Sequence, residues 1–457
     1  MTNEYTSEQV LALAPDAASA KSGQELANTR KWQSLAMNAT AVWGECQGSG
    51  SKPYQTRADL DGPAFKCSCP SRKFPCKHGI GLLLLYALSK ASFRVAEAPP
   101  KWVQEWLETR RERTQKKEKL EENRTPEQLE EARLAKEKRR ANRMDSVKAG
   151  VEELELFLSD LIRQGVGHIK NESYSYFEAR AARLVDAQAP GLARLIRECA
   201  AITSAKTDWQ ETLLNRLATI YLIARAFRNM ANLSPELSED VMAAVGFTQS
   251  QEGLLAAEGV SDVWYVIGQS TYTEDKLRVQ KSFLWGGRNK RVAMILSFAH
   301  GTAPFDVLLI PGQFYEAEVV YYPSVYPLRA LIKSQTLTKV QINPDQLPSG
   351  ETSIEDALKQ YAAALSRLPW LEEFPLLLSE QTLVVDYDQS LYVTDKDGVA
   401  LPLATRDNTG WQLMAFSSGL PVSLFGQFDG VSFIPLSALH ASSDRSGSYL
   451  RLATGEA

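Results

Sequence analysis

Hydrophobic and polar positions divide the 457-residue chain into zones with different periods. Near the N-terminus, polar and apolar residues alternate in Ala41–Cys46 and Tyr54–Leu60, and a Gly/Ser cluster separates the two segments. This pattern predicts two paired strands joined by a turn. Lys77–Lys90 is apolar on almost every side, which predicts a helix buried against two short N-terminal helices.

The middle of the chain changes to a period of three to four residues. Between positions 146 and 245, stripes such as Leu154, Leu158 and Leu161 place apolar side chains on one face of a helix. Several such helices in succession predict a helical bundle. The predicted helices are Val151–Arg163, Tyr174–Asp186, Pro190–Thr203 and Trp209–Met230.

From Val260 onward the pattern is typical of strands, with β-branched and aromatic runs bounded by Gly, Pro and Asn. A β-rich domain is expected first, then a short helix at 353–367. The last strands, with Trp411–Ser417 among them, are expected to form a small barrel. Gly286 and Gly287 predict a hairpin turn. The aromatic segment Tyr321–Arg329 predicts either core packing at a bend or a surface that stacks bases or a peptide.

Residues 101–148 carry many charges and few apolar positions. Trp102 and Trp106 fall on one helical face, and Arg, Lys and Glu dominate the remainder. The pattern is typical of a solvated helix or a partly disordered linker. The alternative is a basic helix that contacts nucleic acid, since Lys136–Arg143 is locally basic although Glu residues interrupt the wider segment.

The strongest chemical signal is a cluster of metal-binding residue types. Three of the five cysteines and one of the four histidines fall within one short segment, as Cys67, Cys69, Cys76 and His78. Three thiolates and one imidazole are the donors of a closed tetrahedral zinc site, and soft donors favour zinc over magnesium or calcium. The intervening loop lets the chain reverse and bring the C-x-C and C-x-H pairs together.

Other interpretations of the cluster are less favourable. Cysteines two residues apart rarely close a disulfide with good geometry, and a chain without a signal peptide is expected in a reducing compartment. A buried, metal-free cluster does not fit the neighbouring lysines. A catalytic zinc would need an open coordination position and usually a nearby carboxylate base. Four good ligands leave no such position, so we expect one structural Zn²⁺.

The spacing C-x-C, a variable loop, then C-x-H resembles the SWIM zinc finger, and the resemblance covers roughly residues 40–90. More loosely, the whole chain resembles bacterial SWIM zinc finger family proteins. The resemblance implies binding of DNA or protein rather than catalysis. It also makes a role in an ATPase-associated assembly conceivable.

Together these patterns predict an α+β multidomain protein. Its parts are a small ββα zinc finger module with N-terminal helices, a helical middle region and a β-rich C-terminal half. The predicted domains are a SWIM-type finger at 1–98, a charged helical linker at 99–148, a helical bundle at 149–258, a β-rich domain at 259–345, and a short helix with a small β-barrel-like module at 346–457.

Charge and the lack of familiar motifs narrow the function. The formal net charge of −4 argues against a uniformly basic surface, so contact with nucleic acid would need a local patch. No catalytic motif is recognisable, so we expect no enzyme and no small-molecule substrate. Met1–Val10 does not have the pattern of a signal peptide, and the longest apolar run, Gly79–Leu88, is too short to span a bilayer. A cytoplasmic protein that does not use a membrane is therefore expected.

Two leading functions remain open at this point, and a third hypothesis is an enzyme whose site lies in the β-rich half. The first is a zinc-binding finger that binds a macromolecule, with DNA as the expected partner. Its phosphate contacts would come from the basic residues of the metal loop, which are Lys66, Arg72, Lys73 and Lys77. The alternative is a protein-interaction adaptor or scaffold, in which the zinc is purely structural and the long helical and β regions bind a protein partner.

Overall fold

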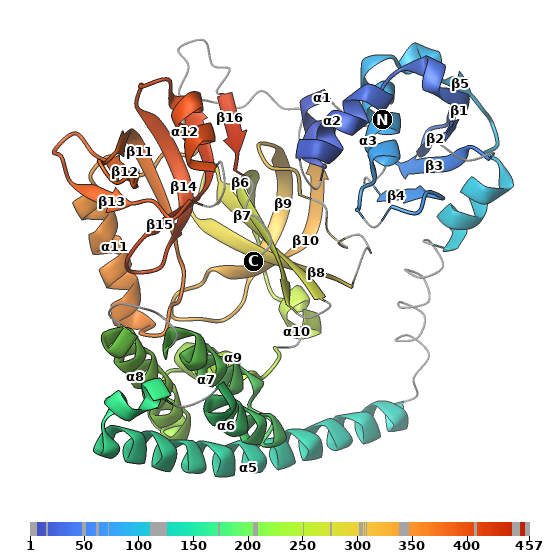
Figure 1. The fold of residues 1–457 in the computed structure, drawn as a ribbon. Helices are drawn as coiled ribbons and strands as arrows, with labels where there is room; N and C mark the ends of the chain where they lie inside the picture. The colour runs from blue at the N-terminus through green and yellow to red at the C-terminus, as the bar shows by residue number, and fades with distance from the viewer. Residues whose placement is uncertain are drawn as a thin grey trace.

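The computed structural model confirms the α+β class and places three parts, the finger, the helical bundle and the C-terminal sheet, around a central barrel (Figure 1). A finger domain comes first along the chain, and the helical bundle forms the base with its first helix beneath it. The structure describes residues 7–14, 17–47, 52–60, 64–71, 73–109, 126–171, 174–203, 209–249, 251–274, 277–300, 305, 307, 309–337, 347–405, 409–440 and 448–452.

The finger domain is built on a five-stranded sheet in the order β4-β3-β2-β1-β5. Helix α3 covers one face through a shared apolar core, and helical residues 101–109 cover the other. The predicted strand pair corresponds to β2 and β3, so the sheet is larger than a ββα unit. The elements are α1 (Ser7–Ala12), α2 (Ala17–Leu26), η1 (Thr29–Lys31), β1 (Trp32–Met37), β2 (Ala41–Cys46), β3 (Tyr54–Asp59), β4 (Ala64–Cys67), α3 (Lys77–Leu88), η2 (Lys90–Ser92) and β5 (Arg94–Val95).

Helices α2 and α3 pack closely because each helix places a glycine at the contact, Gly23 in α2 and Gly81 in α3. A Cβ on Gly81 would lie 2.7 Å from the Cβ of Leu26, and a Cβ on Gly23 would lie 2.5 Å from Ile80 Cγ2. Real side chains do not tolerate such separations, so only glycine permits this crossing. The close approach fixes α2 beside the first turn of α3.

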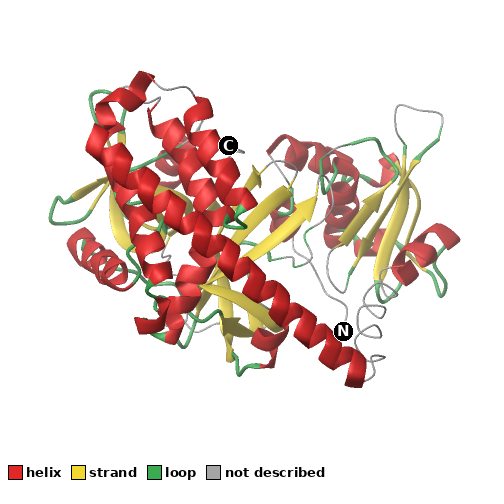
Figure 2. Ribbon diagram, turned by 90° about the horizontal axis from the view of Figure 1, so that it is seen from below, coloured by secondary structure: helices red, strands yellow, loops and turns green. Residues whose placement is uncertain are grey.

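The bundle confirms the predicted middle region, but its first helix is much longer than expected. Helix α5 has 39 residues, so the predicted boundary between linker and bundle at 148/149 lies inside one continuous helix. Figure 2 shows that α5 extends well past the other helices. The predicted linker residues 110–125 lie outside the described residues. The helices are α5 (Pro126–Gln164), η3 (Val166–Asn171), α6 (Tyr174–Asp186), α7 (Pro190–Thr203), α8 (Trp209–Arg228), η4 (Met230–Asn232), α9 (Pro235–Val245) and α10 (Gln251–Ala256).

The β-rich domain after the bundle is a closed five-stranded barrel in the order β10-β8-β7-β6-β9. The long first strand pairs antiparallel with both β7 and β9, and a parallel pair between β8 and β10 closes the barrel. Trp264 and Tyr315 belong to the barrel core. The strands are β6 (Val260–Glu274), β7 (Leu277–Gly286), β8 (Val292–His300), β9 (Phe314–Tyr321) and β10 (Arg329–Leu337).

The C-terminal part corrects two expectations. Its strands form an open six-stranded sheet in the order β13-β12-β11-β14-β15-β16, not a small barrel. Segment Trp411–Ser417 belongs to a helix, because its buried positions recur every three to four residues instead of alternating. The elements are α11 (Ile354–Arg367), β11 (Phe374–Val385), β12 (Leu391–Thr394), β13 (Ala400–Pro402), α12 (Thr409–Ser417), β14 (Val422–Phe428), β15 (Phe433–His440) and β16 (Ser448–Arg451).

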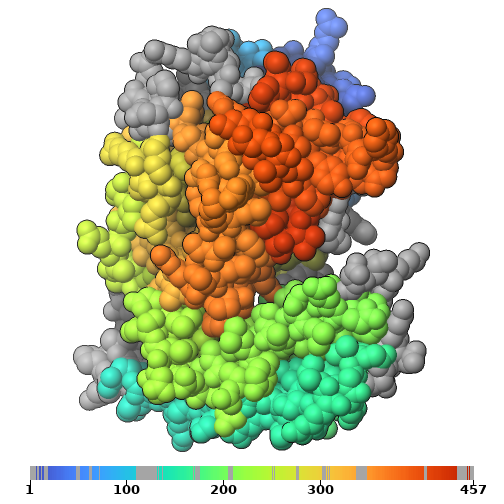
Figure 3. Space-filling model, turned by 90° about the vertical axis from the view of Figure 1, so that its left-hand side faces the viewer, coloured from blue at the N-terminus to red at the C-terminus, as the bar shows by residue number. Residues whose placement is uncertain are grey.

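The C-terminal sheet packs on both the barrel and the bundle. Phe283 of the barrel meets Phe425 of β14 with ring centroids 5.3 Å apart. At the bundle, Glu372 accepts hydrogen bonds from Arg194 and Arg216. Figure 3 shows the C-terminal part sitting directly on the bundle. No helix in the described part of the chain is long and apolar enough to cross a membrane.

Candidate metal centre

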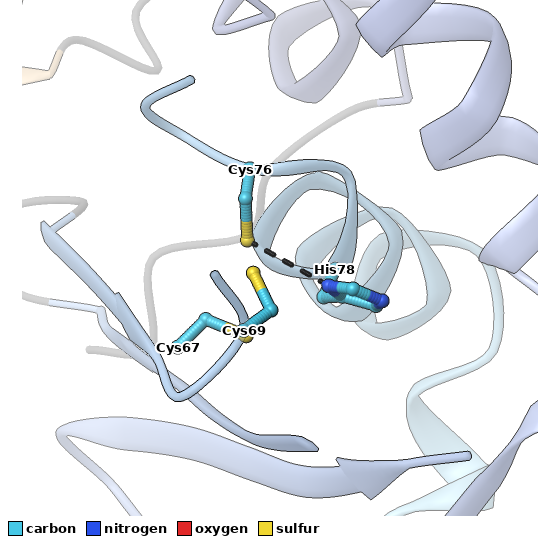
Figure 4. A group of neighbouring side chains, drawn as sticks. All are labelled: Cys67, Cys69, Cys76 and His78. Atoms are coloured by element: carbon cyan, nitrogen blue, oxygen red, sulfur yellow. Dashed lines mark hydrogen bonds between the residues drawn. The ribbon is translucent and has the colours of Figure 1, made fainter. Parts of the chain in front are cut away.

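The cysteine and histidine side chains meet between the end of β4 and the first turn of α3 (Figure 4). One potential ligand atom from each of Cys67, Cys69, Cys76 and His78 lies within 4.8 Å of all the others. Cys76 Sγ and His78 Nδ1 are 3.9 Å apart. Ligand atoms around a tetrahedral zinc are separated by about 3.5–3.8 Å, given the usual Zn–S and Zn–N bond lengths. The four side chains therefore fit one zinc ion with only a small contraction.

Local structure explains why these residues converge. Cys67 ends β4 opposite Thr56 of β3, so its sulfur faces the side of the sheet that α3 covers. Cys76 is the N-cap of α3, and its side chain makes no capping hydrogen bond, which leaves the sulfur available to a metal. Gly79 lets the first turn approach the sheet, because a Cβ there would lie 3.1 Å from Phe65 Cδ1.

Neighbouring groups support the ligands. Thr56, which is fully buried, places its hydroxyl oxygen 3.2 Å from Cys67 Sγ. A metal-bound thiolate can only accept, so this hydroxyl would donate to it. The ring of Tyr54 lies against His78, with centroids 5.0 Å apart. The positive end of the α3 dipole also lies beside the thiolates.

Without a metal, the four groups compete for protons. Burial alone would lower the pKa of His78, but hydrogen bonds to Cys69 and Cys76 and their charges raise it to about 9. Hydrogen bonds from Cys67 and Cys76 lower the pKa of Cys69. The pKa of Cys67 is raised by its bonds to Cys69 and Cys76 and by burial. A divalent cation can replace the shared protons, which is the usual coupling of zinc binding to deprotonation.

The two remaining cysteines, Cys46 and Cys199, are separate from this cluster. Cys46 lies in β2, and burial raises the pKa of its thiol to about 11. The four-residue group of ligand atoms does not include it. Cys199 is buried in the bundle core, where burial raises its pKa to about 12. Both thiols lie in apolar cores, which is a common environment for a cysteine that binds no metal.

The basic residues predicted beside the metal do not form one group. Lys73 and Lys77 line a cavity of about 610 Å³ together with Cys69 and His78. Lys66 pairs across the sheet with Arg57, so it points to the opposite face from Cys67. Arg72 lies outside the described residues. The sheet alternation thus separates Lys66 from the cavity, and the nucleic-acid role of these residues stays a prediction.

Sequence reasoning missed two contributors to the same region. Lys31, at the end of η1, lines the cavity beside Lys73 and Lys77, although more than thirty positions separate it from the metal loop. On the other face, Arg57 is buried and its guanidinium carbon lies 4.9 Å and 5.6 Å from the ring centroids of Trp102 and Trp106. The Trp102 and Trp106 spacing was the available signal, but nothing in the sequence identifies Arg57 as their partner.

Comparison with protein families agrees with this geometry in two separate segments. A SWIM zinc finger model matches residues 64–87, which contain all four candidate ligands. A model of the SWIM-associated four-helix bundle domain matches residues 142–245, which begin within α5 and end with α9. No curated protein and no solved structure matches the chain. The same chain thus contains a SWIM zinc finger, whose Cys3His cluster is consistent with one structural zinc, and a SWIM-associated four-helix bundle domain, a combination that matches SWIM zinc finger family proteins.

Proposed function

We propose that the zinc-organised finger binds the phosphate backbone of duplex DNA, and that the protein acts by binding rather than by catalysis. The supporting observation is the cavity beside the metal centre. Three lysines line it, namely Lys31, Lys73 and Lys77, with hydroxyl groups from Ser19 and Ser22. The described residues that form its wall include no carboxylate. Lysine ammonium groups around a site without acidic side chains favour an anionic ligand such as phosphate.

The metal would fix this arrangement. Lys73 lies in the loop between the two ligand pairs, and Lys77 lies between the ligands Cys76 and His78. Closing the loop on zinc therefore determines where both ammonium groups lie relative to Lys31. Four protein ligands leave no open position on the ion, so the expected chemistry of the metal is structural. A site with three thiolates is itself negatively charged, and the lysines would offset that charge as well.

Binding to duplex DNA tests the proposal. Replacing Lys31, Lys73 and Lys77 together by Ala should weaken an electrophoretic shift of duplex DNA. The log–log dependence of affinity on salt should flatten by roughly two to three units, because each phosphate contact on duplex contributes about −0.9. The charge reversal Lys31→Glu provides a second test, since Lys31 lies outside the metal loop.

Matched controls separate binding from metal retention. Replacing Lys66, Arg94 and Lys101 by Ala changes the net charge equally, but none of these residues lines the cavity. This control should keep the wild-type slope. Metal analysis of both variants should find about one zinc per chain, as in the wild type. Wild-type protein that shifts no duplex at low ionic strength would contradict the proposal, as would equal effects of the two triple variants.

A further inference from the structure

A second cationic surface lies at the end of the barrel, far along the chain from the finger. The turn between β7 and β8 exposes Arg288, Lys290 and Arg291, and the start of β10 exposes Arg329. The parallel pairing of Arg329 with Met294 brings β10 beside β8. Two segments that the sequence marks separately, the Gly-Gly turn and the Tyr-rich stretch before Arg329, therefore meet at one end of the barrel.

Aromatic rings hold two of these arginines in place. The guanidinium carbon of Arg291 lies 4.1 Å from the ring centroid of Tyr321, and that of Arg329 lies 4.5 Å from the ring of Tyr322. Tyr321 is fixed in turn, because its hydroxyl donates to the carbonyl oxygen of Val292 at 3.2 Å. Stacking orders the guanidinium planes before a ligand arrives, so less side-chain entropy is lost on binding.

The turn itself is held by one buried carboxylate. Asp262 accepts hydrogen bonds from the backbone N–H groups of Val263 at 2.7 Å, Arg288 at 3.1 Å and Asn289 at 2.9 Å. Lys290 adopts a left-handed backbone with φ of 56°. The turn therefore has a defined shape, and Asp262 is occupied by backbone donors instead of neutralising an arginine side chain.

Asp262 is an acid of this turn, but the arginine side chains at this end of the barrel form no ion pair with a described carboxylate. Among the described residues, the ion pairs found in the structure include none to Arg288, Arg291 or Arg329. By contrast, other barrel cations are paired, since Lys333 bridges to Glu318 at 2.7 Å. A protein with a net charge of −4 thus exposes three arginines at this end of the barrel without an ion-pair partner in the described part of the chain.

We propose that this surface, made of Arg288, Arg291 and Arg329 with their supporting tyrosines, binds single-stranded nucleic acid. Guanidinium forks match phosphate geometry, and exposed guanidinium planes can stack on unpaired bases. A duplex hides its base faces, whereas a single strand offers both phosphates and bases. An acidic peptide would pair with the charges of the arginines, but its carboxylates offer no flat base on which the guanidinium groups can stack.

The architecture of the barrel is compatible with this ligand. Its five β-strands follow the Greek-key order of the oligonucleotide-binding barrels, in which one face of the β-sheet and the connecting loops contact the nucleic acid. Here the C-terminal sheet buries Phe283 and Trp285 on that face. The exposed turn between β7 and β8 and the connection before β10 are therefore the parts left to contact a ligand. Fold alone does not establish function, and the arginines carry the inference. It is independent of the finger, because no residue is shared between the two surfaces.

Fluorescence anisotropy with labelled single strands of DNA and of RNA tests the proposal on the full chain. Replacing Arg288, Arg291 and Arg329 together by Ala should weaken binding about tenfold or more. It should also flatten the salt dependence by roughly two units, because each contact on a single strand contributes about −0.7. The three Arg→Lys replacements, which keep charge but lose the planar stack, should bind with intermediate affinity.

A matched control replaces Arg163, Lys359 and Arg367 by Ala, which removes equal charge from helices elsewhere. It should leave single-strand binding unchanged. Equal losses in both triple variants, or no binding by the wild type at low ionic strength, would overturn the proposal. So would a poly-glutamate peptide that binds as tightly as an oligonucleotide of the same charge. The Lys31, Lys73 and Lys77 variant should keep single-strand binding and lose only duplex binding, so the two proposals can fail separately.

Discussion

Replacing Thr56 by Val should weaken zinc binding although Thr56 is not itself a ligand. Its hydroxyl oxygen lies 3.2 Å from Cys67 Sγ and 3.4 Å from the carbonyl oxygen of Tyr54, and the side chain is fully buried. Valine has a similar shape but cannot donate to the thiolate. Loss of one outer-shell partner typically lowers metal affinity about 10- to 100-fold, which corresponds to about 1.4–2.7 kcal/mol of binding free energy.

The assay is competition for zinc against a chromogenic chelator at fixed pH, combined with thermal unfolding of the metal-free protein. The metal-free variant should be about as stable as the wild type, because the sulfur of a protonated Cys67 thiol is only a weak acceptor and loses little when the hydroxyl is removed. Thr40→Val is a suitable control, since the Thr40 hydroxyl bonds to Asn38 in the same domain at 3.3 Å. Equal zinc affinities for wild type and Thr56→Val would refute the support that we assign to this hydroxyl.

Three further predictions concern stability. Cys76→Ala should release zinc and expose residues 64–88 to proteases while the barrel stays protected, because the metal closes only a local loop; equal protection of both regions in a limited digest would contradict this. Gly81→Ala should lower the free energy of unfolding by about 1–2 kcal/mol, since the contact with Leu26 is overpacked and the gain in helix propensity only partly compensates. Chemical denaturation checks this against Gly253→Ala, where a Cβ meets nothing within 4 Å, and an equal effect at both sites would count against it. Burial would raise the pKa of Asp395, but backbone N–H donors, the first of them at the start of α11, hold it below its ordinary value of 3.8. A carboxyl whose pKa is lowered in the folded protein stabilises the fold at pH values above its ordinary pKa, and this stabilisation is lost as the pH falls through the folded-state pKa. Asp395→Asn should therefore be less stable at pH 7, and its free energy of unfolding should depend less on pH below about 4. Parallel pH profiles for the variant and the wild type would disprove this.

The ligand set could be predicted because its chemistry is local. Rare donor residues at C-x-C and C-x-H spacing identify a site without knowledge of the fold. Helices with a strong amphipathic period could be predicted equally well. The bounds of α6 (Tyr174–Asp186) and α7 (Pro190–Thr203) are those that the sequence predicts. In both cases the information lies within a few turns of the chain.

Elements that depend on distant partners were not predictable in the same way. Strand β1 contains a bulge with Ser34 at φ 56°, which interrupts the alternation that marks a strand. Strand β5 has only two residues and exists through pairing with β1. The separation of Lys66 from Lys73 depends on strand register, and the position of Lys31 beside the cavity depends on the fold of the finger domain. A spacing pattern carries none of this information.

Helix α5 has a mechanical consequence. At 1.5 Å per residue its 39 residues form a rod of about 58 Å. Arg143 clamps the rod where it enters the bundle, because its guanidinium donates to the carbonyl oxygens of Gln188 and Gly246 at 3.0 Å and 2.9 Å and lies over the ring of Phe247. Before this clamp the described side chains of α5 are exposed to solvent, whereas Val147 is fully buried just beyond it. A force applied to the outer arm would therefore turn the rod about Arg143 and reach the bundle core as torque, with no hinge between them to absorb it.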